Sequence, residues 1–472
     1  MRQQDELAVR FAADASAEGW LKRDVAVLAA VSGGPDSMAL LHLLKTLAEH
    51  TPMRIVVAHA NHQFRGAESD AEEALVRGVA RDWGLPFEAA ALNVPAYIEE
   101  TGMNAQTAAR EKRYIFLREV ASRHGCSYAM FGHHADDQAE TVLMRIIRGT
   151  GPGGLAGIPH RRREEEMELI RPLVRITKGE LLAYCKRNGV PYAVDSSNVD
   201  RHYFRNAVRL DVMPMLETFN PRLKASLARL AELAAADDAY MEAETLQAFR
   251  LGVTADGEGY RVGRRRFRGL HVALQRRLVK LILSCSEGLE RQFDYRLVED
   301  IVSVVTPELP AATRMELGGG WELVREYDEV YIGPIRPNPA SYCYPIDTDT
   351  DAVLVGETGE RFAIERLQGA AKSSGDRSAE ACFDEEELVY PLRIRSRTPG
   401  DVMEPHGLNG SKKVQDMFVD AKVPRYLRDR MPLLVDGEGR VLWIPGLRRS
   451  RHALIGEGTR KTLRIAIEHP EN

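Results

Sequence analysis

Short apolar runs alternate with amphipathic stretches along the first 190 residues. The apolar runs are typical of buried strands, and we predict strands at 25–31, 54–59, 87–94 and 128–132. The amphipathic stretches repeat their apolar positions every three to four residues, which predicts helices at 5–21, 38–44, 68–83, 104–124, 135–148 and 177–188. This alternation predicts an α/β fold with a doubly wound parallel sheet, in which ligands bind at the carboxyl ends of the strands.

The pattern changes after residue 215. Longer helical patterns follow at 223–250, 270–284 and 295–305, and residues 315–332 alternate as a hairpin does. We therefore predict a chain of four segments: an N-terminal α/β domain at 1–215, a mainly helical domain at 216–335, a linker with short strands at 336–389, and a small β-rich α+β domain at 390–472.

Composition narrows the function classes. The net charge of −5 offers no general basic field, so a nucleic-acid site must be a local patch. The five cysteines are scattered without a C-x-x-C pair, which argues against a zinc site, a metal cluster and a disulfide framework, and suggests a reducing cytoplasm. We expect no signal peptide and no membrane contact, because no apolar stretch is long enough for either.

The loop Ser32-Gly33-Gly34-Pro35-Asp36-Ser37 joins the first strand to a helix. Its glycines let backbone N–H groups approach an anion, its serine hydroxyls can donate to phosphate oxygens, and the helix start adds partial positive charge. Asp36 would repel phosphate, so we expect it to hold a divalent cation that bridges to the phosphates. An ordinary glycine turn is the alternative, but the two serines and the strand–helix context favour phosphate binding.

The helix at 135–148 begins with a second polar cluster. His133, Asp137 and Glu140 are spaced i, i+4 and i+7 and fall on one helical face. Carboxylates beside a triphosphate hold Mg²⁺ or accept a proton, and the sequence does not choose between these tasks for Asp137. An acidic helix start that complements the helix dipole is the alternative, but the position at the end of a strand favours function.

Both clusters carry a resemblance to a known family. The loop matches the S-G-G-x-D-S signature of the PP-loop ATP pyrophosphatases, and residues 132–141 resemble the G-H-x-x-D-D-x-x-E-T motif of the tRNA(Ile)-lysidine synthetases. The first resemblance implies that ATP is cleaved between its α and β phosphates, that a substrate is adenylated, and that the loop holds the departing pyrophosphate. Asp36 and Asp137 are then the expected Mg²⁺ ligands.

Three further stretches extend the resemblance. Residues 58–65 are similar to the motif ending in H-x-x-R that borders the adenosine, which implies nucleotide contacts by Ala58, His59, His62 and Arg65, with Asn61 where the family often has aspartate. Residues 108–114 resemble the A-A-R-x-x-R-Y helix. Residues 195–209 resemble D-x-[ST]-N…R-N-x-[LIV]-R.

Arginines of these two motifs are candidates for the site. Arg110 and Arg113 can grip phosphates or a carboxylate, although a salt-bridged helix face is an equal alternative. Arg205 is the polar group of its motif that we expect to reach the site. The expected catalytic residues are therefore Asp36, Arg113, His133, Asp137, Glu140 and Arg205.

The C-terminal region resembles the tRNA-binding domain of the same family. The similarity lies in residues 395–401, 410–413, 422–424 and 445–450, and residues 393–430 hold nine Lys or Arg against five Asp or Glu. Such a patch suits phosphate contacts that position an RNA. The resemblance implies that free L-lysine is ligated to C2 of the first anticodon cytidine of an isoleucine tRNA, through an adenylated tRNA and with ATP and Mg²⁺, by a possible homodimer.

Two other functions remain open from the sequence. A PP-loop tRNA thiolase would pass sulfur through cysteines, and the chain has no paired or loop-placed cysteine. A non-enzymatic adenine-nucleotide-binding module would need the loop alone, and would leave the carboxylate helix and the basic C-terminal segment without a role.

Overall fold

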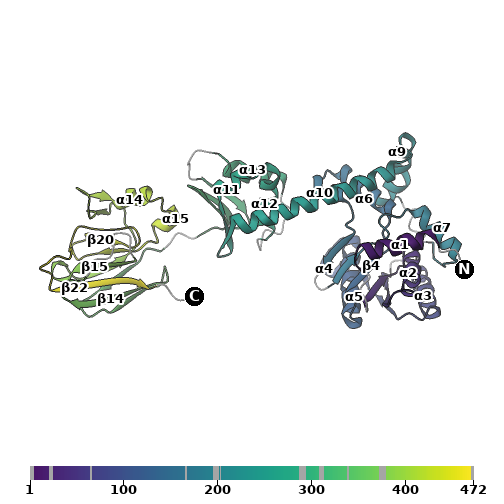
Figure 1. The fold of residues 1–472 in the computed structure, drawn as a ribbon, viewed down its shortest axis with the longest axis horizontal. Coiled ribbons are helices and arrows are strands. Elements are labelled where there is room, and N and C mark those ends of the chain that lie inside the picture. Colours follow the sequence, from purple (N-terminus) through teal and green to yellow (C-terminus); the bar gives the residue numbers. More distant parts are fainter. Residues whose placement is uncertain are drawn as a thin grey trace. The chain divides into compact units, whose positions relative to one another are not determined.

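The computed structural model describes residues 5–20, 25–63, 66–164, 167–194, 201, 204–285, 294–307, 313–336, 340–371 and 379–468 (Figure 1). The chain divides into two compact units, 1–242 and 243–472. Among the helices of the described residues, none has both the length and the apolar composition that a membrane crossing needs.

A six-stranded sheet forms the centre of the first unit. Its strand order is β3-β2-β1-β4-β6-β5, and all neighbours are parallel except β5 and β6. The strands are β1 (Val25–Ala30), β2 (Met53–Asn61), β3 (Phe87–Ala91), β4 (Tyr128–Phe131), β5 (Arg161–Glu164) and β6 (Met167–Ile170). The four predicted strands are confirmed, whereas the sequence analysis assigned no strand to β5 and β6.

Apolar side chains alternate between the two faces of this sheet, and each face has its own helical layer. Val27 and Val57 point into a core shared with α1 (Glu6–Ala17), α2 (Pro35–Ala48), α3 (Ala67–Asp82) and α7 (Lys178–Asn188). Leu28 and Val56 point into the opposite core with α4 (Val94–Thr101) and α5 (Ala105–His124). Strands buried on both faces are what a doubly wound α/β domain requires, so the predicted fold class is confirmed.

The remaining helices of the first unit follow β4 and α7. These are α6 (Ala135–Arg148), a short 3₁₀ turn (Pro152–Ala156), α8 (Phe204–Ala207), a π-helical turn (Val208–Val212), α9 (Met213–Phe219) and α10 (Leu223–Gly252), which contains the boundary between the units. α6 packs through Ala139 and Val142 against Val208 and Leu227. This packing ties the start of α10 to the helix that carries the predicted carboxylates.

The strand order reverses between β1 and β4, and this is where such sheets bind ligands. Gly132, at the end of β4, touches the first turn of α2: a Cβ atom there would lie 3.0 Å from the carbonyl carbon of Asp36 and from the nitrogen of Ser37. The absence of a side chain at Gly132 therefore lets the PP-loop helix approach the end of β4.

The second unit begins with an antiparallel sheet of order β7-β8-β11-β10-β9. It consists of β7 (Val253–Asp256), β8 (Gly259–Gly263), β9 (Thr313–Gly318), β10 (Trp321–Glu326) and β11 (Glu329–Pro334), and packs with α11 (Arg264–Gly269), α12 (Val272–Ser284) and α13 (Tyr295–Val305). The predicted helices are confirmed. The alternation at 315–332 belongs to three strands rather than a two-stranded hairpin, and β7 and β8 complete the sheet.

Two further sheets share one apolar core in the rest of this unit. One has the order β12-β16-β19-β20-β21 and the other β13-β14-β22-β15. The strands are β12 (Cys343–Ile346), β13 (Ala352–Val355), β14 (Glu360–Gln368), β15 (Glu380–Asp384), β16 (Leu392–Arg395), β19 (Leu433–Val435), β20 (Val441–Ile444), β21 (Arg448–Arg449) and β22 (Lys461–Glu468). Short elements complete this part: β17 (Val402–Met403), β18 (Lys412–Lys413), α14 (Val414–Asp420), α15 (Arg425–Arg428) and a 3₁₀ turn at Glu385–Glu387.

This arrangement corrects the prediction of a linker at 336–389. β12 pairs with β16, β14 and β15 pair with β22, and Phe362 and Phe383 lie in the same core as Trp443 and Leu463. The short strands expected there are present, but they belong to the C-terminal sheets, because their apolar faces are buried against strands more than 40 residues further along the chain.

Candidate active site

A cavity of about 760 Å³ lies at the carboxyl ends of the central strands. Its walls come from the PP-loop and α2, the exits of β2 and β4, and α5. Nine of the predicted site residues line it, namely Ser32, Asp36, Ser37, Ala58, His59, His62, Arg113, His133 and Asp137. Gly33, Gly34 and Pro35 lie in the same loop, and Arg65 falls outside the described residues. The cavity does not include Glu140 and Arg205.

The PP-loop has a backbone shape set by its glycine, its proline and its own hydrogen bonds. Gly33 has φ +95°, in the left-handed region that favours glycine, and Pro35 opens α2 at a position that needs no backbone donor. The Ser37 hydroxyl donates to the Gly34 carbonyl (3.0 Å) and accepts from the Ser32 N–H (3.1 Å). Ser37 therefore stabilises the turn, whereas the exposed Ser32 hydroxyl is the one better placed to meet an anion.

Three helix N-termini meet beside this loop. The first residues of α2, α6 and α7 are Pro35, Ala135 and Lys178. The Ala135 N–H donates to the Ile176 carbonyl (2.8 Å), and the Lys178 N–H donates to Oδ2 of Asp136 (2.9 Å). Because each N-terminus carries partial positive charge, their convergence favours anions and the ionised forms of nearby carboxylates.

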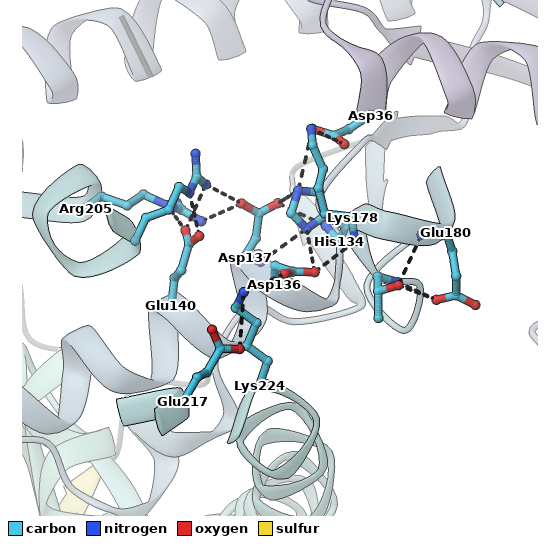
Figure 2. Close-up of polar contacts among 12 residues, drawn as sticks. Asp36, His134, Asp136, Asp137, Glu140, Lys178, Glu180, Arg205, Glu217 and Lys224 are labelled. Carbon is cyan, nitrogen blue, oxygen red and sulfur yellow. Dashed lines mark hydrogen bonds and ion pairs between the residues drawn. The ribbon is translucent and has the colours of Figure 1, made fainter. Parts of the chain in front are cut away.

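Asp36 is held by two basic side chains. Both of its carboxylate oxygens lie 2.7 Å from Nζ of Lys178, and Oδ2 lies 3.6 Å from Nε2 of His134 (Figure 2). Burial by itself raises the pKa of Asp36, but the hydrogen bonds and charges of His134 and Lys178 hold it below its ordinary value. Burial opposes protonation of His134, yet its hydrogen bond to the Asp36 carboxylate and the charges of Asp137 and Asp36 raise its pKa.

Asp137 is fixed by the start of its own helix. His134 and Asp137 form a reciprocal cap: the His134 N–H donates to Oδ2 of Asp137 (3.0 Å), and the Asp137 N–H donates to Nδ1 of His134 (3.3 Å). On its other side, Oδ1 of Asp137 lies 2.8 Å from Nη2 of Arg205 and 3.3 Å from Nη2 of Arg209. The cap fixes the start of α6 and the orientation of the Asp137 carboxylate.

Glu140 lies one turn further along α6 and away from the cavity. Its side chain is 3% exposed and accepts from Nε of Arg205 (2.9 Å) and from Nε of Arg209 (2.6 Å), as Figure 2 shows for Arg205. The three residues predicted on one helical face therefore have two different roles. His133 and Asp137 border the cavity, whereas Glu140 anchors the arginines that contact Asp137. Arg205 reaches the site through this network.

A cation and two neutral imidazoles line the inner cavity. Arg113 is half-buried and lies 5.6 Å from the ring centroid of Tyr114, whereas Arg110 is exposed and does not border the cavity. Burial, with the charge of Arg113, lowers the pKa of His62 to about 4. Burial also lowers the pKa of His133 to about 4, against the opposing effect of the Asp137 charge. Both imidazoles are therefore neutral at pH 7.

His59 and Asn61 shape the exit of β2. His59 is 2% exposed, and its Nδ1 lies 2.8 Å from the Val31 carbonyl, so this side chain links β2 to the end of β1. The Asn61 amide donates to Asp70 (3.1 Å) and Glu73 (3.3 Å). An aspartate in place of Asn61 would face two other carboxylates, which gives a physical reason for asparagine here.

The sequence analysis did not single out Lys178, His134 or Arg209. A lysine in the first turn of a helix opposes the helix dipole, and this unfavourable position is the signal that Lys178 has another task. Arg209 lies in the same motif as Arg205, and His134 lies in the same stretch as Asp137. The resemblance that indicated Arg205 and Asp137 could therefore have indicated these two residues as well.

The oxygen donors at this site suit Mg²⁺. Oδ2 of Asp36 and Oδ2 of Asp137 lie 3.6 Å and 3.4 Å from the same atom, Nε2 of His134. Over the residues that the structure describes, no three His, Cys, Asp or Glu side chains are grouped to hold an ion alone. Two adjacent carboxylates are nevertheless a fitting set, because Mg²⁺ commonly takes one or two carboxylates and completes its shell with substrate phosphates and water.

Two family models match separate parts of the chain. Residues 5–216 match the PP-loop domain family, and residues 392–466 match the family described as the TilS substrate C-terminal domain. A tRNA(Ile)-lysidine synthase of Bacillus cereus is 32% identical over 458 residues, which cover 95% of this chain and 94% of the relative. The enzyme of the same name from Bacillus subtilis is 34% identical over 428 residues, covering 90% of each.

A solved structure, a U34-tRNA thiolase from Methanococcus maripaludis, is 22% identical with a TM-score of 0.43, and the match covers 49% of this chain and 79% of that chain. The curated relatives extend over nearly the whole chain at a higher identity. On that ground, this chain belongs to the tRNA(Ile)-lysidine synthase family.

Proposed function

We propose that the chain ligates free L-lysine to C2 of the first anticodon cytidine of an isoleucine tRNA, consuming ATP and releasing AMP and pyrophosphate. The observation that carries the proposal is the cavity in which the PP-loop, Asp36, Asp137 and Arg113 meet. Relatives at 32–34% identity bear the corresponding name. The thiolase alternative has little support, because none of the five cysteines lines the cavity.

In the first step, the C2 oxygen of the cytosine attacks the α-phosphorus of ATP, and the bond to the β-phosphate oxygen breaks. The PP-loop N–H groups, the Ser32 hydroxyl and the N-terminus of α2 stabilise the pyrophosphate as it leaves. Asp36 and Asp137 would hold Mg²⁺, which supplies charge neutralisation at the phosphates when bound. Arg113 contributes a positive charge to the cavity lining.

In the second step, the amine of lysine attacks C2, and the bond from C2 to the adenylate oxygen breaks so that AMP leaves. The ammonium has an ordinary pKa of about 10.4, so it must give up a proton before it attacks. His62 and His133, with pKa values of about 4, are weak bases and act as hydrogen-bonding groups at pH 7. Asp137 borders the cavity and is our candidate to accept this proton, if it does not serve as a metal ligand.

The basic C-terminal segment is the proposed RNA contact. Three of its nine cations form ion pairs within the segment: Arg395 with Asp401 (2.7 Å), Arg397 with Asp429 (2.5 Å), and Lys412 with Asp420. These pairs leave an excess of positive charge, which suits contacts to phosphates that position an RNA without reading its sequence. A homodimer and a cytoplasmic location are further parts of the proposal.

Radiolabelled ATP, with the label in the α-phosphate, tests the order of events. Wild-type protein with isoleucine tRNA and no lysine should place label on the RNA, and adding lysine should release labelled AMP and modify the base. Label on lysine in the absence of RNA would mean that the amino acid is activated first. Absence of label on the RNA under both conditions would rule out the adenylated tRNA.

A further inference from the structure

We propose that Lys178 is a pyrophosphate-binding residue that neutralises Asp36 in the free protein and moves to the phosphate oxygens when nucleotide binds. The inference rests on the proposed function, because it assigns a partner to a side chain within the same site. Three features of the site support this role: the charge of the loop, the anchoring of the Lys178 main chain, and the difference in burial between Asp36 and Glu140.

The PP-loop contains no cationic side chain of its own. Its six residues, 32–37, include one carboxylate, Asp36, and no Lys or Arg. A departing pyrophosphate carries several negative charges, and backbone N–H groups carry only partial positive charge. The ammonium of Lys178, 2.7 Å from both oxygens of Asp36, is the cation that the structure pairs with this loop. A short movement of that ammonium would bring it to a phosphate held by the loop.

The main chain at Lys178 is held by hydrogen bonds of its own, independently of the side chain. Thr177 and Glu180 cap α7 reciprocally, with the Glu180 N–H donating to Oγ1 of Thr177 (3.3 Å) and the Thr177 N–H donating to Oε2 of Glu180 (2.8 Å). The Lys178 N–H is held by Asp136. Beyond this anchor, four methylene groups carry the ammonium, which is a compact charge on a flexible stem and can change partner without moving the helix.

Burial distinguishes a movable pair from a fixed one. The three cations are similarly exposed, Lys178 at 34%, Arg205 at 37% and Arg209 at 33%. The acidic partners differ, because the side chain of Asp36 is 25% exposed whereas that of Glu140 is 3% exposed. Partly exposed ion pairs contribute little net stability, since water competes for both charges. Lys178 can therefore leave Asp36 at small cost when Mg²⁺ and phosphate arrive together, while the arginine group stays in place.

The test compares Lys178→Met with Lys224→Met. Nζ of Lys224 lies 3.4 Å from Oδ1 of Asp136 and 3.4 Å from Glu217, and its side chain is 40% exposed, so it is a similarly exposed lysine in the same network that does not contact Asp36. Calorimetric titration with magnesium pyrophosphate should show affinity about tenfold weaker or more for Lys178→Met, and within about twofold of wild type for Lys224→Met. Lys178→Arg keeps the charge and should recover part of the loss.

A second measurement separates exchange of partners from simple damage. Mn²⁺ binding to the protein without nucleotide, followed by electron paramagnetic resonance, should become tighter in Lys178→Met by about threefold or more, because the competing ammonium at Asp36 is gone. Unchanged pyrophosphate affinity would overturn the inference, and so would weakened binding of both Mn²⁺ and pyrophosphate. Failure of wild-type protein to label RNA would instead count against the proposed function, whatever Lys178→Met does to pyrophosphate binding.

Discussion

Glu140→Gln removes one charge from α6 and keeps the shape of the side chain. In the wild type, the Glu140 carboxylate is 3% exposed and receives three hydrogen bonds of 2.6–2.9 Å from Arg205 and Arg209. A hydrogen bond to a charged group contributes about 1.5–3 kcal/mol, and breaking a buried ion pair costs about 3–5 kcal/mol. The variant should therefore destabilise the packing of α6 on the segment that carries the arginines.

The lower end of that range is the better value here. The side chains of Arg205 and Arg209 are 37% and 33% exposed, so water can solvate them once Glu140 is neutral, and Asp137 still accepts from both. We expect a loss of about 3 kcal/mol in the free energy of local opening, which corresponds to roughly a hundredfold change in the opening constant.

Hydrogen exchange followed by mass spectrometry reads this opening directly. Peptides from α6 should exchange about a hundredfold faster in Glu140→Gln, while peptides from residues 243–468 give an internal reference. Asp211→Asn is the matched control, because the pair between Asp211 and Arg201 (3.1 Å) has side chains 49% and 66% exposed and should contribute at most about 1 kcal/mol. Equal exchange in the two variants would refute the argument that the buried pair holds α6.

Four other predictions concern catalysis, pH, domain boundaries and salt. Asp36→Ala should abolish turnover, and Asp137→Asn should lower it at least about a hundredfold. Rescue of Asp137→Asn by Mn²⁺ would favour the metal role of Asp137 over the base role. Activity within tenfold of wild type in either variant would remove that residue from the mechanism. The pKa of His62 is lowered from an ordinary 6.5 to about 4, so its contribution to stability is present above pH 6.5 and is lost as the pH falls towards 4. At pH 5.5 the free energy of unfolding should be about 1.4 kcal/mol lower for this reason. Hydrogen exchange should show this loss in the wild type and not in His62→Gln. A chain ending at residue 389 should aggregate, because it exposes the core around Phe362 and Phe383, whereas one ending at 336 should stay folded, bind ATP and lose most tRNA affinity. Binding of tRNA by the full chain should fall steeply with salt in a filter-binding assay, and salt-insensitive binding would contradict the assignment of the basic segment.

Local signals in contiguous residues determined much of the first unit. The four predicted strands and the helices around them follow from the period of apolar positions, and the loop at 32–37 follows from its glycines and serines between a strand and a helix. These features depend on neighbours a few residues away, and for that reason the pattern predicted them. The cap between His134 and Asp137 is equally local, since it spans three residues, yet it was not predicted.

In the second unit, local patterns did not predict which strands pair with one another. β12 to β15 read as short strands in a linker, but their partners β16 and β22 lie elsewhere in the chain, and the choice of partner depends on burial of both faces. The sheet of β7 to β11 was likewise only partly predicted, because β8 pairs with β11 across the three intervening helices. Pairing between distant strands leaves no period in the sequence that a local pattern can detect.

The active site combines both kinds of information. The sequence indicated Asp36, Asp137, His133 and Arg113. The fold brings them to one cavity because β1, β2 and β4 end there and α5 begins there. The ion pairs among these residues could not be predicted: Lys178 meets Asp36 across 142 positions, and Arg205 meets Glu140 across 65. Those contacts exist because α7 packs on α2 and the π-helical turn packs on α6, and helix packing is decided by the whole core rather than by any one stretch of the chain.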